Sequence, residues 1–302
     1  MKLHSYTSLH DLHAMLDLLS EGCEADNGTH YIHRGDLQWW LFYTDTPQEL
    51  WQSRIRLWME VDRLIGWALL SPEDDAFDVY TIPALRGSPQ ENEMLTSIVD
   101  EMSALDELNN LWVAEDDEVR IQWFEEHGFK VADEHSVHFT RSLSGPLPDP
   151  QLPEGFSLRT SHGDEADARL RAVTSHAAFK SGMKFEDYWP RTLRFMQSPV
   201  YVKEYEIFVI APNGDVAAYC IIWTDELTKL GHFEPVGTHP DYQRKGLGKS
   251  LLFEGLRRLK SEDMNEADVC TNHDNSAAIR LYESVGFQKD KRLLTYKKKR
   301  TL

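Results

Sequence analysis

The sequence has 302 residues, a formal net charge of −18 and 27% charged residues. This length is large for one domain and suits two domains of about 150 residues, each with its own core. Residues 1–145 hold 28 acidic against 9 basic residues, whereas residues 146–302 hold 22 against 23, so the first half carries the negative charge, which argues against nucleic acid as a partner.

No segment of the sequence suggests export or a membrane. Residues 1–5 lack the basic and apolar regions of a signal peptide, and no apolar run approaches the roughly 18 residues of a membrane span. The three cysteines, Cys23, Cys220 and Cys270, are too scattered for a disulfide framework or a zinc site. We therefore expect a cytoplasmic protein with no membrane partner and no metal.

The first half begins with a strand-like segment and an acidic helix. His30 and His33 follow three residues apart, but no third ligand is evident, so they do not predict a metal site. The four tryptophans within residues 39–58 either fill a core or line a substrate groove. An apolar strand is predicted after a turn within residues 62–70. Acidic runs such as residues 115–118 are either solvated loops or a means of attracting a cationic substrate.

A segment rich in proline separates the two halves. Residues 144–155 are expected to form an extended, semi-rigid linker between a domain at 1–143 and a domain at 156–302. The second half then predicts a strand, two helices and a hairpin, at residues 156–159, 163–174, around 185–189, and at 207–210 with 217–223.

Residues 230–238 predict a strand that carries two titratable side chains. Strict alternation places the side chains of His232, Glu234, Val236 and Thr238 on one face of the strand. Phe233, Pro235 and Gly237 then lie on the other face. The imidazole and the carboxylate would then point the same way. Proline and glycine both weaken a regular ladder of hydrogen bonds, so we expect an irregularity in this strand.

A loop with two glycines follows and opens a helix. Leucines recur at helical spacing after Gly248, so Gly246 and Gly248 lie at a helix N-terminus. Backbone N–H groups without internal partners and the helix macrodipole make such an end a site for an anion. Arg244, Lys245 and Lys249 add positive charge around it. A pyrophosphate would fit this loop.

Two nucleotide-binding motifs do not match the loop. A Walker motif would need glycine in place of Gln243, and a dinucleotide fingerprint would need glycine in place of Leu251. The pattern Gln-x-x-Gly-x-Gly over residues 243–248 instead resembles the acetyl-CoA loop of the GNAT superfamily of N-acetyltransferases. Residues 275–287, with an Asn, a Leu-Tyr-Glu and a Gly-Phe in that order, resemble the second GNAT signature. The two signatures together indicate a GNAT domain at about residues 155–297.

The resemblance implies an α/β protein with two tandem GNAT-like domains, each a mixed, mostly antiparallel sheet flanked by helices. The first half reads as a diverged copy, because residues 117–129 align without gaps with residues 275–287. The copy lacks the glycine loop and has Phe124 in place of Tyr282. We expect it to have lost acetyl-CoA binding and to shape or cover the active half. The arrangement is similar to that of bacterial tandem acetyltransferases of the mycothiol synthase type.

The resemblance also implies acetyl-CoA as the cosubstrate and assigns residues to it. Backbone groups of the strand would pair with the pantetheine arm, the loop would hold the pyrophosphate, and an asparagine would hold an amide of the cofactor. The residues concerned are Val236, Gly237 and Thr238 for the arm, Gln243, Arg244, Lys245, Gly246, Leu247, Gly248 and Lys249 for the loop, and Asn275 for the amide.

Three side chains are candidates for the chemistry. Acetyl transfer to an amine needs a base, for which we favour Glu234 with His232 as the rival, although Glu234 could instead only bind a substrate group. Tyr282 would protonate the departing thiolate. The expected function is transfer of the acetyl group to a primary amine of a small molecule by direct attack in a ternary complex. The alternative is a non-catalytic acyl-CoA sensor or scaffold. We expect a monomer or a homodimer.

Overall fold

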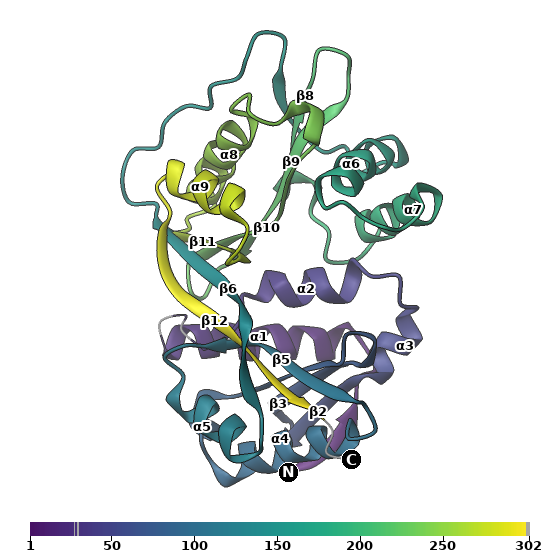
Figure 1. The fold of residues 1–302 in the computed structure, drawn as a ribbon, viewed down its shortest axis with the longest axis vertical. Coiled ribbons are helices and arrows are strands. Elements are labelled where there is room, and N and C mark those ends of the chain that lie inside the picture. The colour runs from purple at the N-terminus through teal and green to yellow at the C-terminus, as the bar shows by residue number, and fades with distance from the viewer. Residues whose placement is uncertain (27, 29, 300–302) are drawn as a thin grey trace.

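The computed structural model describes residues 1–26, 28 and 30–299 and consists of two lobes connected by long strands (Figure 1). A single 12-stranded sheet runs through both lobes in the order β1-β2-β3-β4-β5-β12-β6-β11-β10-β9-β8-β7. Most neighbouring strands are antiparallel, and β4 with β5 and β10 with β11 are parallel. The predicted α/β fold class with mostly antiparallel sheets is confirmed.

The first half alternates helices with strands up to residue 142. Its elements are β1 (Lys2–Ser5), α1 (Leu9–Ala25), α2 (Arg34–Phe42), α3 (Gln48–Ser53), β2 (Ile55–Glu60), β3 (Arg63–Ser71), β4 (Ala76–Thr81), α4 (Pro89–Glu101), β5 (Glu107–Ala114), α5 (Glu118–Glu126) and β6 (Lys130–Ser142). The helices α1 and α2 pack on one face of the sheet, and α4 and α5 pack on the other.

The second half repeats this order of elements. It comprises β7 (Ser157–Thr160), α6 (Glu165–Ala178), α7 (Phe185–Met196), β8 (Glu206–Ile210), β9 (Val216–Asp225), β10 (Leu230–Thr238), α8 (Leu247–Ser261), β11 (Glu266–Asn272), α9 (Ser276–Ser284) and β12 (Gln288–Lys299). The helices α8 and α9 cover one face of its sheet, and α6 and α7 cover the other. The predicted strand, helices and hairpin after the linker are all present.

The same local signals begin and end the repeated helices α5 and α9. The side chain of Asp117 accepts a hydrogen bond from the N–H of Arg120, and that of Asn275 accepts one from Ala278 at 3.2 Å. Each helix is followed by a glycine with positive φ, 81° at Gly128 and 86° at Gly286. The internal repeat that the sequence predicts is therefore also a repeat of structure.

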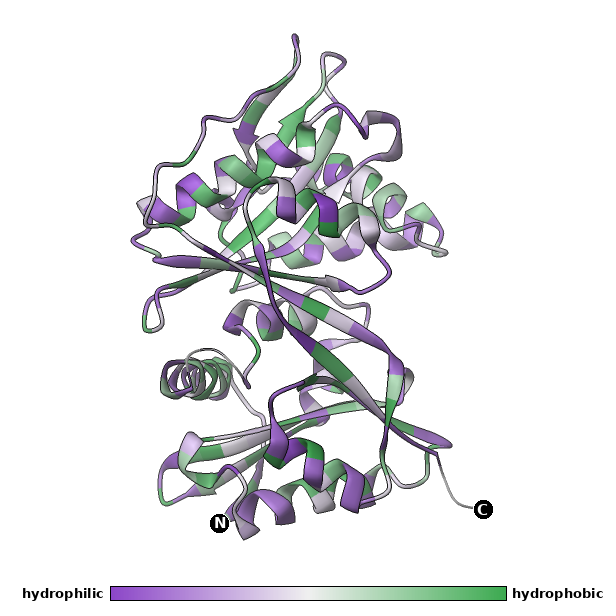
Figure 2. Cartoon of the chain, turned by 60° about the vertical axis from the view of Figure 1, so that its left-hand side comes forward, coloured by the Kyte–Doolittle hydropathy of each residue, from purple (hydrophilic) through white to green (hydrophobic). Residues whose placement is uncertain are grey.

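The last strand of each half crosses into the sheet of the other half. β6 of the first half pairs with β11 of the second, and β12 of the second half pairs with β5 of the first. Figures 1 and 2 both show these two long strands passing from one lobe to the other. The division of the chain at residues 143 and 156 stays a proposal, because the halves share one sheet.

Helix α2 of the first half lies between the two lobes (Figure 1). A Cβ atom added at Gly35 would lie 2.5 Å from Cγ of Trp223 on β9, so only glycine allows this close approach. Trp39 of α2 packs against Phe195 of α7 with ring centroids 5.1 Å apart. The first half therefore covers part of the face of β9 and β10 on which α6 and α7 also lie. Within the part of the chain that the structure describes, no helix is long and apolar enough to cross a membrane.

Candidate active site

The strand β10 separates from its parallel neighbour β11 after three residue pairs. Leu230 to His232 pair with Glu266 to Asp268, and from Phe233 onward β10 pairs with β9 alone. The backbone groups of β10 that face β11 are therefore available to another partner over the second half of the strand. This separation is the kind of irregularity that Pro235 and Gly237 predict for this strand.

A bulge at Glu234 and Pro235 interrupts β10 where it leaves β11. Phe233 lies opposite Ile222 and Val236 lies opposite Cys220, so β10 has one residue more than β9 in this interval, and the Glu234–Pro235 peptide is cis. The extra residue reverses the alternation of side chains. The prediction that His232, Val236 and Thr238 share one face is therefore wrong.

Positions beyond the bulge confirm the reversal. A Cβ atom at Gly237 would lie 2.7 Å from Tyr219, which packs with α6, whereas Val236 packs in the core with α8. Gly237 thus lies on the face of His232, which pairs with Trp223. The simple alternation that was expected fails because it assumes a regular ladder.

Glu234 lies at the bulge, and its carboxylate accepts no hydrogen bond from the described residues. Its carbonyl oxygen accepts a hydrogen bond from Nε1 of Trp223 at 2.8 Å, whereas none of the described residues hydrogen-bonds to its carboxylate. The side chain is half-buried. Burial, together with the nearby charge of Asp36, raises the pKa of Glu234 to about 7, and His232 opposes this shift. A carboxylate with this pKa can both accept and release a proton near neutral pH.

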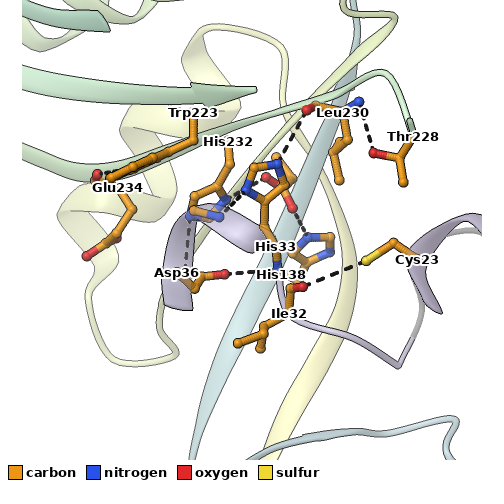
Figure 3. Close-up of polar contacts among 12 residues, drawn as sticks. Cys23, Ile32, His33, Asp36, His138, Trp223, Thr228, Leu230, His232 and Glu234 are labelled. Atoms are coloured by element: carbon orange, nitrogen blue, oxygen red, sulfur yellow. Dashed lines mark hydrogen bonds and ion pairs between the residues drawn. The ribbon is translucent and has the colours of Figure 1, made fainter. Parts of the chain in front are cut away.

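His232 is buried between two carboxylates (Figure 3). Its Nδ1 lies 2.6 Å from Oδ1 of Asp268 on β11, and its Nε2 lies 3.1 Å from Oδ1 of Asp36 on α2. Burial alone would lower the pKa of His232, but the two carboxylates outweigh it and raise that pKa well above its usual range. The two carboxylates therefore favour the cationic form of the ring, with Nδ1 hydrogen-bonded to Asp268 and Nε2 within ion-pair distance of Asp36 but without a hydrogen bond among the described residues.

The chain of charged groups continues from Asp268 to the protein surface. Oδ2 of Asp268 lies 2.9 Å from Nε2 of His138 on β6, and Nδ1 of His138 lies 3.0 Å from Oδ2 of Asp290 on β12. Burial opposes the charge on His138, but Asp268 and Asp290 raise its pKa to about 9. A cavity of about 30 Å³ adjoins this chain, which is room for water and not for a substrate.

The sequence analysis missed four members of this cluster, Asp36, His138, Asp268 and Asp290. None belongs to a motif, and Asp36, His138 and Asp268 lie more than 100 residues from one another in the sequence. The only sequence signal is the position of Asp268 in the strand after the anion loop. Among the described residues no group of three or more His, Cys, Asp or Glu side chains is arranged to hold a metal ion.

The glycine loop lies at the N-terminus of α8. Gly246 is the N-cap with φ of 80°, no side chain caps this helix end within residues 1–26, 28 and 30–299, and a Cβ at Gly246 would meet nothing within 4 Å. The backbone N–H groups of the first turn thus face open space, as an anion site requires. Arg244 and Lys245 are exposed beside it, and Lys249 lies over the ring of Phe253 at 5.8 Å.

Contacts tie the loop to the end of β10. Nε2 of Gln243 donates to the carbonyl oxygen of Thr238 at 3.3 Å. Gly248 brings α8 close to α9, since a Cβ there would lie 3.1 Å from Leu281. Leu247, which the sequence analysis grouped with the loop, is buried as the first residue of α8. The backbone of the loop and the splayed part of β10 therefore belong to one continuous surface.

Tyr282 lies on α9 with its ring in the core and 6% of its surface exposed. The ring packs edge to face against Phe139 at 5.9 Å and Phe287 at 6.1 Å. No hydrogen bond to its hydroxyl is formed by the residues described. Burial, with the nearby carboxylate of Glu234, raises the pKa of Tyr282. The phenol is therefore protonated and close enough to Glu234 to sense its charge.

The first half fills its own anion position with a side chain. The buried carboxylate of Glu91 accepts a hydrogen bond from the N–H of Gly87 at 2.6 Å, in front of α4, and binds Arg120 at 2.7 Å. Arg86 pairs with Asp117 beside it. These internal ion pairs occupy the groups that a phosphate would need, which gives a physical reason why this half would not bind the cosubstrate.

Comparison with known proteins gives matches along the whole chain. Residues 173–287 match the family model for "Acetyltransferase (GNAT) family". A mycothiol acetyltransferase of Streptomyces coelicolor is 32% identical over 148 residues, which are 49% of this chain and 48% of that protein. One of Thermobispora bispora is 26% identical over 244 residues, 78% of this chain and 80% of that protein. The chain thus spans about half of the first relative and four-fifths of the second.

Solved structures share the fold along the full length of the chain. A tandem GNAT protein from the clavulanic acid biosynthesis pathway has a TM-score of 0.67 at 14% identity, covering 100% of this chain and 99% of that one. A GCN5-related N-acetyltransferase from Sphaerobacter thermophilus has a TM-score of 0.63 at 18% identity, covering 100% and 96%. At these identities the likeness concerns the fold.

Proposed function

We propose that the chain is a tandem GNAT N-acetyltransferase with acetyl-CoA as its cosubstrate, and that its second half transfers the acetyl group to a primary amine of a small molecule. The match of residues 173–287 to the GNAT family model, the mycothiol acetyltransferase relatives and the shared tandem fold support this proposal. The observation that carries this proposal is the carboxylate of Glu234, which lies where β10 leaves β11, accepts no hydrogen bond from the described residues and has a pKa raised to about 7. A base of this pKa is suited to deprotonating an ammonium group near neutral pH.

The residues present fit the cosubstrate. The free edge of β10 at Val236, Gly237 and Thr238 offers backbone groups to the pantetheine arm. The uncapped helix end at Gly246, with the exposed cations beside it, offers a site for the pyrophosphate. Asn275 uses its side-chain oxygen as a helix cap, so its amide N–H₂ group is the part that would bind the cosubstrate.

Three groups of the protein would act in the reaction. Glu234 accepts a proton from the ammonium of the acceptor, and the amine nitrogen then attacks the thioester carbonyl carbon. A free N–H of β10 donates to the carbonyl oxygen as negative charge develops there. Tyr282 donates its proton to the sulfur as the carbon–sulfur bond breaks. The attacking nitrogen loses its second proton, which restores the phenol of Tyr282, and Glu234 releases its proton to solvent. The products are the N-acetylated amine, the free thiol and one proton per turnover.

Glu234 is a better candidate for the base than His232. Both ring nitrogens of His232 face carboxylates, at 2.6 and 3.1 Å, and the ring is a cation. A ring in that state has no lone pair to accept a proton. Its role would be electrostatic, beside the base. No observation favours the alternative of a non-catalytic sensor.

The acceptor is defined here only as a small-molecule amine. The relatives are named for mycothiol. We propose no more specific acceptor, since in this proposal α2 of the first half forms the acceptor side of the site. In this proposal residues 1–143 close the acceptor side of the site and residues 156–302 bind the cosubstrate.

A panel of amino sugars, polyamines, arylalkylamines and amino acids, assayed for thiol release with acetyl-CoA and for the acetylated product by mass spectrometry, tests the function. We expect release that depends on at least one amine and on both substrates. Saturable binding of acetyl-CoA without thiol release to any amine would contradict the proposal and favour the sensor.

A further inference from the structure

Five charged side chains form a continuous chain across the junction of the two halves, from the partly buried Asp36 to the exposed Asp290. The order is Asp36, His232, Asp268, His138 and Asp290, and the four links measure 3.1, 2.6, 2.9 and 3.0 Å. Figure 3 shows Asp36, His232 and His138 converging from α2, β10 and β6. Carboxylates alternate with imidazoles, so each buried charge has an opposite neighbour.

The strand exchange is what assembles this chain. Asp36 and His138 belong to the first half, and His232, Asp268 and Asp290 belong to the second. β6 carries His138 to Asp268 because it pairs with β11, with Cys270 opposite His138 in the register. Neither half alone contains two consecutive links. The chain therefore ties the electrostatics of the second half to the presence of the first.

Helix α2 holds Asp36 in a fixed position over β10. His33 caps the helix, since its Nδ1 accepts a hydrogen bond from the N–H of Gly35 at 2.9 Å. The same ring stacks on His232 with centroids 4.9 Å apart, and its Nε2 lies 3.3 Å from the carbonyl oxygen of Leu230. Oδ2 of Asp36 accepts a hydrogen bond from the N–H of His33, which leaves Oδ1 directed at His232.

Two charged groups act on Glu234, namely Asp36 from α2 and His232 from β10. Glu234 in turn acts on Cys270 from β11 and on Tyr282 from α9. Cys270 and Tyr282 are neutral near pH 7, because burial raises the pKa of both groups. The charges that bear on Glu234 are therefore the anion of Asp36 and the cation of His232, with opposite signs.

We propose that Asp36 is a positioning residue of the active site, through which the first half controls the pH at which Glu234 accepts a proton. This inference rests on the proposed function, in which Glu234 is the base. The half that has lost the cosubstrate loop thereby contributes directly to catalysis. Its contribution is one anion next to the base, held by the imidazolium of His232.

The sign of the effect follows from the charges. Removing the anion of Asp36 makes it easier to ionise Glu234, so the pKa of Glu234 should fall. Asp268 remains 2.6 Å from His232 and keeps the ring cationic in such a variant. A nearby charge shifts a carboxyl pKa by about one unit or more, so we expect a shift of roughly one unit.

The matched control is Asp45→Asn. Asp45 is also a first-half carboxylate that pairs with the second half, since its Oδ1 lies 2.9 Å from Arg194 of α7. It is not among the groups that act on Glu234. Asp36→Asn keeps an oxygen that can accept from His33, so α2 should stay in place.

The test is an NMR titration of the side-chain carboxyls in full-length protein labelled at glutamate, with the Glu234 signal identified by its loss in Glu234→Gln. We expect the midpoint of Glu234 to fall by roughly one pH unit in Asp36→Asn and to stay in Asp45→Asn. In the assay with the best amine of the panel, the acidic limb of kcat/KM should move by the same amount.

An unchanged midpoint in Asp36→Asn, or an equal shift in both variants, would overturn the inference. The titration needs no acceptor, so its result stands even if no amine is acetylated, an outcome that would refute the proposed function separately. Equal loss of activity in both variants without a shift of the pH profile would show a merely structural role and would also overturn the inference.

Discussion

The substitution Glu234→Gln tests the assigned base through the pH dependence of the reaction. With a pKa of about 7, roughly one Glu234 in eleven is ionised at pH 6 and roughly ten in eleven at pH 8. If the ionised carboxylate deprotonates a bound ammonium, kcat/KM of the wild type should rise about tenfold between these values and then level off.

The variant should behave differently in both size and shape. Glutamine cannot accept the proton, so kcat/KM should fall by roughly 10² to 10⁴ at pH 7. Only the small fraction of neutral free amine would then react, and kcat/KM should rise about tenfold per pH unit without levelling near pH 7. The measurement is thiol release at several pH values, with acetyl-CoA saturating.

Two results would refute the reasoning about Glu234. One is a wild-type profile without an inflection near pH 7. The other is a Glu234→Gln variant that keeps its rate while it still binds acetyl-CoA. Either result would leave Glu234 as a residue that only binds a substrate group, which was the alternative reading of this position.

Three further variants test other parts of the structure. Tyr282→Phe should lower kcat at least about tenfold with little change in KM for acetyl-CoA, and an unchanged kcat would remove the phenol from the mechanism. The pKa of His138 is raised to about 9 in the folded protein, so the stability that its charged form contributes is complete below about pH 6.5 and is lost as the pH rises through 9. Urea unfolding should show a loss of roughly a few kcal/mol over this range, and this pH-dependent loss should be smaller in His138→Asn. Gly35→Ala should lower the free energy of unfolding by about 1–3 kcal/mol, because its Cβ would lie 2.5 Å from Trp223, and an unchanged melting temperature would contradict the tight packing of α2.

Local signals in the sequence were sufficient to predict much of the structure of the second half. The positive φ at Gly246 and the cap at Asn275 depend on residues adjacent in the chain, so the anion loop and the α9 signature could be located from sequence alone. An irregularity in β10 was also predicted from Pro235 and Gly237, which disfavour a regular ladder.

Features that depend on distant segments could not be predicted. The exchange of β6 and β12 is a choice between equivalent partners, since either strand could pair within its own half. The bulge at Glu234 adds one residue, which no count of alternating side chains reveals. His138 enters the site through the exchange of β6 and Asp36 through the packing of α2 on β9 and β10, and neither a lone histidine on a strand nor a lone acid on a helix belongs to a motif.

The central claim is that the second half binds acetyl-CoA at the loop of Gly246 and Gly248. Thermal melting of the purified protein with acetyl-CoA, with coenzyme A, and with ATP and magnesium tests it most directly, in the wild type and in the double variant Gly246→Glu, Gly248→Glu. A ligand at a hundred times its Kd adds about 2.7 kcal/mol to stability. The account predicts that acetyl-CoA and coenzyme A each raise the melting temperature of the wild type and that ATP with magnesium does not. In the double variant none of the three ligands should shift the melting temperature. No shift of the wild type with acetyl-CoA or coenzyme A would contradict it.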